Sequence, residues 1–132
     1  MEFKITTKRE LDLVDITDIM QDFVSKSGLK DGILFLFLPH ATAALITLEN
    51  ESGLVDDFKK AISELIPEGV GYRHDRIDNN AHSHIRASLL GADLFVPISN
   101  GELVLGTWQQ IFLVELDTRA RTRRLYAKIL TR

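Results

Sequence analysis

Three of the four histidines of this chain lie in one short stretch, RHDRIDNNAHSHIR, at residues 73–86. Neutral imidazole is the commonest protein ligand for zinc and similar metals, and three imidazoles with one open position would make a catalytic type of site. The fourth histidine, His40, follows the apolar run ILFLFLP, at the expected end of a buried strand. Exposed charge would explain a polar loop, but it does not explain this concentration of histidines. The stretch is therefore a candidate metal or catalytic site.

The spacing of His82 and His84 leaves two interpretations open. Residues i and i+2 share one side of a strand but diverge by about 200° on a helix, and the apolar pattern of HIRASLLG is helical. We therefore expect both histidines to straddle a helix start with Asn80 as the N-cap, so that at most one ring reaches a shared site. In the alternative interpretation they are polar and capping residues of a surface helix.

The same helix start is a candidate anion site. Its first amide groups lack internal partners and the helix dipole is positive there, and Arg86 lies close behind. A phosphate-bearing ligand near His84 is physically reasonable on these grounds. Arg86 could equally pair with Asp78 or Glu51, and the sequence leaves both alternatives open.

Polar residues also lie where other elements begin. Glu49, Asn50 and Glu51 precede an amphipathic helical pattern. They could act as a general base, a substrate-orienting amide and a helix-start carboxylate, or they could only complement the helix dipole. His74 could be oriented by its neighbour Asp75. Since one strand, one loop and one helix all direct polar groups toward a possible common cleft, we predict that these groups converge.

The segment RARTRRLYAK, at residues 119–128, is the one locally basic stretch. Its alternation predicts a final strand with Arg124, Tyr126 and Lys128 on one side, which is typical of a solvated or subunit-facing surface. The formal net charge of −3 argues against a dedicated nucleic-acid binder. We therefore expect no nucleic-acid partner, and an arginine of this segment could instead capture phosphate or pyrophosphate.

Length and composition limit the class of protein. The chain of 132 residues is 45% hydrophobic and 27% charged and has no cysteine. We expect a single domain over residues 1–132 whose core needs no disulfide, and thiolate chemistry is excluded. The chain shows neither a signal-peptide core nor an apolar run long enough to cross a bilayer. These features predict a cytoplasmic protein without a membrane partner.

The elements that would position these residues alternate between strands and helices. Strands are expected at residues 3–7, 33–39, 43–48, 93–98, 102–106, 108–117 and 124–129; helices are expected from Asp15 to Gly28, from Glu49 to Pro67 and from His84 to a left-handed cap at Gly91. About seven strands and about three helices, mostly linked by hairpins, predict an α+β fold with antiparallel or mixed sheet layers. Several strands lack a polar face, including residues 33–39, which suit a strand covered on both faces. We therefore expect a homo-oligomer.

Four stretches together resemble the YjbQ family, also known as uncharacterised protein family 0047. They are HATAALITLEN at 40–50, RHD at 73–75, HSHIRASLLG at 82–91 and NGELVLGTWQQI at 100–111. The similarity spans nearly the whole chain in order, and the S-x-x-[LIV]…G-x(4)-G-T-W-Q element, from Ser88 to Gln109, is highly specific. The resemblance implies a YjbQ-like α+β subunit assembled as a homotrimer, with polar pockets near subunit boundaries and a metal held by histidines.

The resemblance also implies an activity. Family members are often named secondary thiamine-phosphate synthase, an enzyme that joins hydroxymethylpyrimidine pyrophosphate to thiazole phosphate and releases pyrophosphate. The activity is regarded as weak and secondary. We therefore expect a metal-binding enzyme that acts on phosphorylated small metabolites. Its expected reaction type is that of a transferase. A metal-assisted hydrolase, or a non-catalytic trimeric module that binds a metal or a metabolite, is the alternative.

The resemblance implies a role for each residue of this chain that matches a position of the family's motifs. The metal would be a divalent cation, zinc foremost, although three imidazoles also suit nickel, copper or iron. Its expected ligands are His40, His74 and His84, with His82 outside the set. The expected catalytic residues are Glu49, Asn50, Asp75 and Gln109. The residues expected to bind substrate or phosphate are Thr42, Arg86, Thr107, Trp108 and Arg123.

Overall fold

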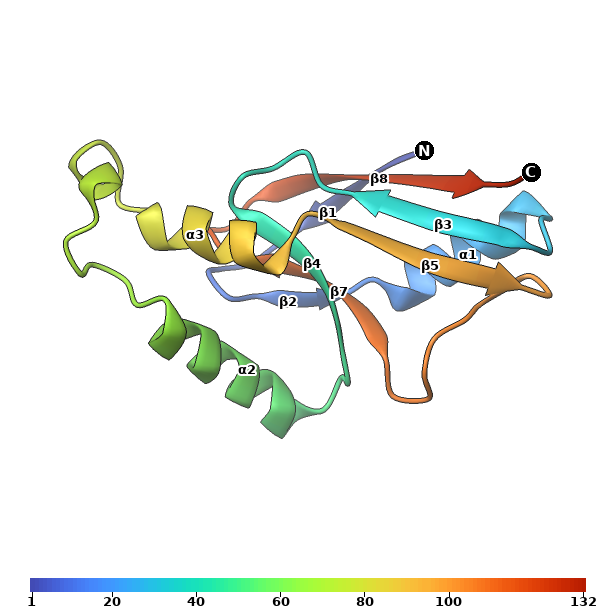
Figure 1. Ribbon diagram of the computed structural model, residues 1–132, viewed down its shortest axis with the longest axis horizontal. Helices are drawn as coiled ribbons and strands as arrows, with labels where there is room; N and C mark the ends of the chain where they lie inside the picture. Colours follow the sequence, from blue (N-terminus) through green and yellow to red (C-terminus); the bar gives the residue numbers. More distant parts are fainter.

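The computed structural model describes residues 1–132 as two antiparallel sheets and three α-helices (Figure 1). Sheet A has the strand order β1-β8-β3-β5-β6, and sheet B has the order β2-β7-β4. The strands are β1 Glu2–Thr6, β2 Leu13–Asp15, β3 Gly32–Phe37, β4 Ala43–Leu48, β5 Asp93–Ser99, β6 Glu102–Leu103, β7 Gln110–Glu115 and β8 Thr122–Leu130. The helices are α1 Thr17–Ser27, α2 Ser52–Leu65 and α3 Ala81–Leu90, with a short 3₁₀ helix at Arg73–Arg76. The predicted α+β fold class is confirmed.

The main core lies between the two sheets and is closed by α1. Alternate residues of β8 and β3 point inward, as the two-residue period of a strand requires. The buried apolar side chains of this core are Ile5, Leu34, Leu36, Val96, Ile98, Leu125 and Ala127 of sheet A, Ala43, Leu45, Ile111 and Leu113 of sheet B, Met20 and Val24 of α1, and Ile16 and Leu38 of the connecting segments. Sheet A therefore buries one face against sheet B and α1.

A smaller apolar cluster attaches α3 to the other face of sheet B. Ala87 of α3 packs with Ala44, Val114 and Leu116. Its small side chain lets the helix approach the sheet closely, next to the point where β3 leads into β4. This contact holds the histidine-bearing helix beside the loop that carries His40.

One local feature of the sheets was predicted and another was not. The hairpin at Asn100-Gly101 is confirmed: both residues have positive φ, 52° and 77°, and they join β5 to β6. Strand β2 was not predicted, because three residues are too few to show a period, and it forms by pairing with β7.

The cap of α1 differs from the prediction by one residue. Ile16, not Asp15, occupies the N-cap position. Asp15 still satisfies the helix start, because its Oδ1 accepts hydrogen bonds from the backbone N of Thr17 at 3.0 Å and from its Oγ1 at 2.6 Å. Gly28 ends the helix in the left-handed conformation, with φ 73°, as predicted.

The caps of α3 also need correction. Asn80 is the N-cap residue, but its side chain makes no capping hydrogen bond. Asp75 does so instead, since its Oδ1 accepts from the backbone N of Ala81 at 3.0 Å. Gly91 has positive φ but an extended ψ, 100° and 158°, rather than the left-handed helical pair predicted. The chain therefore turns directly into β5 after the helix.

Strand β3 has one covered face, not two. Ile33 and Phe37 are each 41% exposed and Phe95 of β5 is 59% exposed, while Phe35 stacks against Phe37 and lies 4.7 Å from the Phe95 ring. We call this surface the outer apolar face; its apolar residues are Ile33, Phe35, Phe37, Phe95, Tyr126 and Leu130, and exposed Lys128 of β8 lies beside Phe35 among them. Contiguous exposed apolar surface of this kind marks interaction sites.

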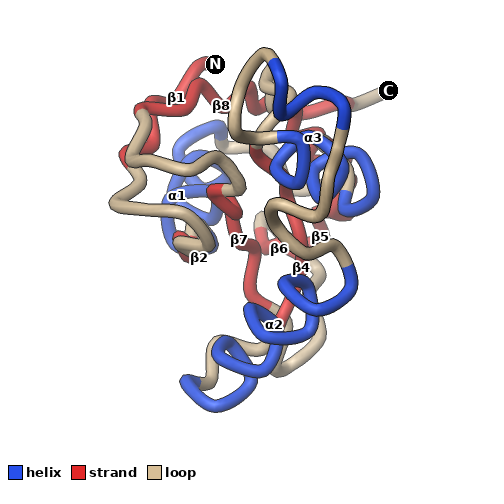
Figure 2. The backbone as a smooth tube through the Cα atoms, turned by 90° about the vertical axis from the view of Figure 1, so that its left-hand side faces the viewer, coloured by secondary structure: helices blue, strands red, loops and turns tan.

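Helix α2 projects away from the two sheets (Figures 1 and 2). Of its fourteen residues only Ile62 is buried, and Leu65, an apolar residue at the end of the helix, is 67% exposed. None of the helices has the length and hydropathy that a bilayer-spanning segment needs.

Candidate functional site

Strands β7 and β8 each bring one charged side chain into the space between the sheets. Glu115 continues the inward face of Ile111 and Leu113, and Arg123 begins the inward face of β8. Both are almost fully buried, at 0% and 3% exposure. Arg123 Nε donates to Glu115 Oε1 at 2.9 Å, and its Nη2 pairs with Oε2. This two-point geometry is the one that best offsets the desolvation of both charges.

Neighbouring polar groups complete the hydrogen bonds of this ion pair. Arg123 Nη2 also donates to the backbone O and to Oγ1 of Thr42, both at 2.9 Å. Glu115 accepts from Thr7 Oγ1 at 2.7 Å and from the backbone N of Asp117 at 3.0 Å. We call these five residues the buried polar network. Arg123 and Thr42, expected to bind phosphate, are thus engaged within the protein.

His40 lies at the edge of the buried polar network. Its Nε2 accepts from the backbone N of Arg124 at 2.9 Å, and its Nδ1 lies 3.4 Å from Arg123 Nη1. Burial, together with the charges of Arg123 and Arg124, lowers the pKa of His40 below 6.5, so the ring is neutral at pH 7. A neutral ring that accepts at Nε2 carries its proton on Nδ1. In this orientation His40 has no spare lone pair, and its ring must turn before it can bind a metal.

His74 is oriented by Asn80 and not by its neighbour Asp75. Its Nε2 lies 3.0 Å from Asn80 Oδ1, while Asn80 Nδ2 donates to Asp117 Oδ1 at 3.3 Å. Because an ionised carboxylate only accepts, Asn80 must present its oxygen to His74, and His74 Nε2 must carry the proton. The lone pair of His74 therefore resides on Nδ1, in the arrangement that fixes metal-binding histidines.

Asp117 connects the surroundings of these two histidines. Its Oδ2 accepts from Thr42 Oγ1 and from Arg121, and its Oδ1 accepts from Asn80 and from the backbone N of Thr118. Burial alone would raise the pKa of Asp117, but the hydrogen bonds from Thr118, Asn80 and Arg121 and the charge of Arg121 outweigh it and hold the pKa below 3.8. Sequence reasoning did not identify Asp117, although a carboxylate directly after the apolar strand was the available indication.

His84 lies between two hollows of the surface. One, of about 570 Å³, is lined by His40, His84 and small residues of α3. The other, of about 550 Å³, is lined by His74, His84 and Tyr72 among others. The rings of His74 and His84 are 4.9 Å apart, centroid to centroid. The structure thus brings His84 close to His74 and places His40 along the neighbouring hollow, but the three rings do not line one common hollow.

A second set of expected site residues surrounds a separate hollow of about 530 Å³. Glu49, Asn50, Thr107 and Trp108 line it, and Trp108 is 70% exposed. Asn50 Nδ2 donates to Asp15 Oδ2 at 3.0 Å. This set shares no hollow with the histidines within the chain.

Two neighbours of that set have local structural partners. Glu51 caps α2 by accepting from the backbone N of Gly53 and of Leu54, and these bonds lower its pKa. Gln109 accepts from the backbone N of Gly106 at 2.7 Å, which holds the loop before β7.

The side chains of Arg86 and His82 point into the protein. Arg86 donates from Nε to the backbone O of Ile66 at 2.9 Å, and its Nη1 lies 3.7 Å from Glu10 Oε2. Its carboxylate partner is therefore Glu10, not Asp78 or Glu51. His82 Nε2 lies 3.3 Å from Glu10 Oε1. His82 and His84 diverge, as helical spacing predicts, and Glu10 is a partner that sequence reasoning missed.

Comparison with known proteins places this architecture among closely similar chains. The family model described as UPF0047 protein YjbQ-like matches residues 1–132. A UPF0047 protein of Archaeoglobus fulgidus is 42% identical over 130 residues, which cover 98% of this chain and all of that protein. The Bacillus subtilis UPF0047 protein YugU is 34% identical, covering 95% of this chain and 93% of that protein.

Solved structures give the same result for the fold. A YbjQ-like protein of unknown function from Sulfolobus solfataricus has a TM-score of 0.96 at 42% identity, covering all of this chain and 96% of that one. A yjbq/upf0047 family protein of Clostridium acetobutylicum has a TM-score of 0.92 at 34% identity, covering 98% and 99%.

Replacement of Glu115 by Gln should destabilise the protein strongly. The change leaves Arg123 buried without its counter-charge, so we expect the free energy of unfolding at pH 7 to fall by about 3–5 kcal/mol. Urea denaturation followed by circular dichroism measures this. The matched control is Glu64→Gln on the exposed side of α2, where the carboxylate only approaches Lys60 at 4.0 Å, with an expected change below about 1 kcal/mol. Equal effects of both variants would contradict the role assigned to the pair.

The depressed pKa of Asp117 predicts the pH range in which its charge stabilises the fold. A carboxyl group whose pKa is lower when folded contributes stability that is present above its ordinary pKa of 3.8 and is lost as pH falls through the folded value. The difference in unfolding free energy between wild type and Asp117→Asn should therefore be constant from pH 5 to 7, within the limits of about 0.5 kcal/mol that urea titrations allow, and should shrink below 3.8. A difference that is unchanged at the acid end would refute this assignment.

Proposed function

Since the chain belongs to the UPF0047 family of YjbQ-like proteins, we propose that it is a metal-binding enzyme that acts on phosphorylated small molecules. The observation that carries this proposal is the pair His74 and His84, with rings 4.9 Å apart and with the His74 lone pair directed to Nδ1 by Asn80. The proposed reaction joins hydroxymethylpyrimidine pyrophosphate to thiazole phosphate and releases pyrophosphate, as a weak secondary activity.

The residues present fit a divalent cation, with zinc foremost. His74 and His84 would hold it, and His40 would join them once its ring turns away from the Arg124 amide. When bound, such a cation neutralises the negative charge that develops on a departing pyrophosphate. The low pKa of His40 favours this role, because protons do not compete for the ring near neutral pH.

The chain's own residues have separate parts in this proposal. Arg123 and Arg86 are buried and paired, so their proposed contribution to phosphate binding is electrostatic and through the positioning of neighbours. Trp108 and Thr107 are exposed beside Glu49, where an aromatic face can stack on a substrate ring and the threonine hydroxyl can bind phosphate. Their main task is to orient two substrates, which alone supplies a large part of a rate enhancement.

We propose that the working form is a homotrimer. Two observations support an assembly: the outer apolar face is exposed in one chain, and the histidines and the Trp108 set occupy separate hollows of that chain. Contact between subunits would cover the outer apolar face. It would also bring the histidines of one subunit close to the Trp108 hollow of another. We also place the protein in the cytoplasm, which suits a chain without cysteines.

The synthase proposal is tested with tag-free protein loaded with zinc and supplied with both substrates. We expect thiamine phosphate to form, and we expect His84→Ala to lower the rate by about 100-fold or more, in line with the loss of a metal contact. Lys60→Ala, on the exposed side of α2, is the control and should leave the rate unchanged.

Two results of this assay would overturn the synthase assignment. Metal binding without product, but with release of phosphate from phosphorylated metabolites that depends on Glu49, would indicate a metal-assisted hydrolase. Metal binding without any turnover would indicate a non-catalytic module.

The assembly is tested by charge substitution on the outer apolar face. Phe95→Asp should dissociate the oligomer, because burial of a carboxylate in an apolar contact is strongly unfavourable. Light scattering should then give the mass of one chain, with unchanged circular dichroism. The control is Ile19→Asp on α1, which lies on the opposite side of sheet A and is 40% exposed. A wild-type mass of about 14.9 kDa at micromolar concentration would contradict the proposal.

A further inference from the structure

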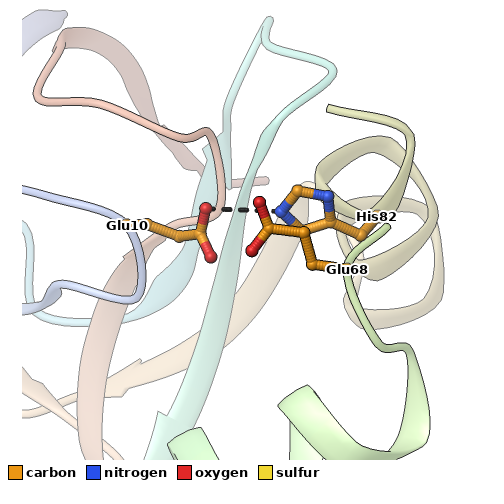
Figure 3. Close-up of side chains that lie close together, drawn as sticks. All are labelled: Glu10, Glu68 and His82. Atoms are coloured by element: carbon orange, nitrogen blue, oxygen red, sulfur yellow. Dashed lines mark hydrogen bonds and ion pairs between the residues drawn. The ribbon is translucent and has the colours of Figure 1, made fainter. Parts of the chain in front are cut away.

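We propose that Glu10, Glu68 and His82 form a divalent-cation site distinct from the histidine hollows (Figure 3). Glu10 lies in the loop after β1, Glu68 in the loop after α2, and His82 in the first turn of α3. One ligand atom from each lies within 4.8 Å of the other two. No other group of three or more such residues in the chain is arranged in this way.

The surroundings of His82 require an explanation that packing does not give. The ring is fully buried, its Nε2 has only the 3.3 Å contact with Glu10 Oε1, and its Nδ1 has no hydrogen-bond partner. Buried polar atoms are nearly always satisfied, and each exception needs a specific cause. Two carboxylates converge on this ring, and one N–H can donate to only one of them. A cation that accepts the Nε2 lone pair would bind both carboxylates and the ring at once, with the proton of His82 on Nδ1.

Arg86 provides an independent observation at the same place. Its side chain is 2% exposed, its Nη1 has no hydrogen-bond partner, and this atom points at Glu10 Oε2 from 3.7 Å. Glu10 therefore turns one oxygen toward Arg86 and the other toward His82. Outer groups that hold a carboxylate in this manner are a regular feature of metal sites.

The charge balance also favours a cation. Glu10 has the Arg86 guanidinium beside it, whereas Glu68 forms no salt bridge with any lysine or arginine, so the three side chains together carry two negative charges and one positive charge. A neutral His82 leaves the group with one net negative charge. Glu68 is exposed and Glu10 is partly exposed, so that a hydrated ion can reach the group from solvent.

The donor set determines the class of ion. One imidazole and two carboxylates suit Zn²⁺ and Mn²⁺, while Mg²⁺ prefers oxygen ligands only. A bound ion would join three segments that are distant in the sequence, namely the loop after β1, the connection from α2 and the start of α3. It would thereby fix the helix turn that carries His84.

The test separates this site from the histidine hollows by working in a His84→Ala background. Tag-free protein, stripped with a chelator, is titrated with Zn²⁺, Mn²⁺ and Mg²⁺ by calorimetry, and its melting temperature is recorded with each ion. We expect one Zn²⁺ or Mn²⁺ to bind per chain and to raise the melting temperature by several degrees, with no comparable effect of Mg²⁺.

Adding Glu68→Gln to this background should weaken binding by about tenfold or more and abolish the thermal shift. Glu68 is exposed, so this variant is expected to fold; Glu64→Gln is the matched control and should change neither value. Equal binding by the Glu68→Gln and Glu64→Gln variants, or no binding of either ion, would overturn the proposal. A metal that is lost through His84→Ala alone belongs to the site of the proposed function. A metal that is retained in His84→Ala and lost on adding Glu68→Gln belongs to the site formed by Glu10, Glu68 and His82.

Discussion

Two opposite charges, on Glu115 and Arg123, are buried between the sheets, in a place where apolar side chains of similar volume would give comparable or greater stability. What the ion pair adds is geometric specificity. An apolar contact tolerates small shifts, but each oxygen and N–H of this pair needs a partner at a particular place, and Thr7, Thr42 and the Asp117 backbone supply them. The end of β8 is thus fixed against β7 and against the loop that precedes β4.

The residues around this end of β8 determine whether the lone pairs of His40 and His74 are available. Burial, together with the positive charges of Arg123 and Arg124, lowers the pKa of His40 and keeps that ring neutral, while the Arg124 amide donates to its lone pair. His74 is held through Asn80 by Asp117, and its lone pair is left available. One network therefore leaves the lone pair of one imidazole without a protein donor and engages the lone pair of the other.

The sequence predicted what depends on periods and short turns. The alternation of β8, the apolar run of β3, the helical pattern of α3 and the Asn100-Gly101 turn all follow from local chemistry, and each was located within a few residues. What it could not predict depends on contacts between distant segments. Asn80 was expected as a cap because its position is local, but its actual partner, Asp117, is 37 residues away.

The same limit explains the errors about charged side chains. Arg86 was expected either to bind a phosphate at the start of its helix or to pair with Asp78 or Glu51. A buried arginine needs a carboxylate or another acceptor beside it in the interior. Glu10 is far from Arg86 in sequence, and only the fold places the two side chains next to each other. Nor could the exposure of β3 be inferred, since an apolar run does not specify whether its outer face meets another layer of the same chain or another molecule.

Helix α2 is an element whose apolar residues are mostly not buried within the chain. Its one buried residue, Ile62, cannot supply the burial that usually holds a helix of this length, and isolated helices of fourteen residues are marginal in water. Its Glu51 cap stabilises the start but not the apolar stripe. The helix and the outer apolar face both leave apolar side chains exposed in one chain, and the site residues occupy separate hollows of that chain. The sequence pattern and the single-chain burial therefore disagree at these three places and agree in the core between the sheets.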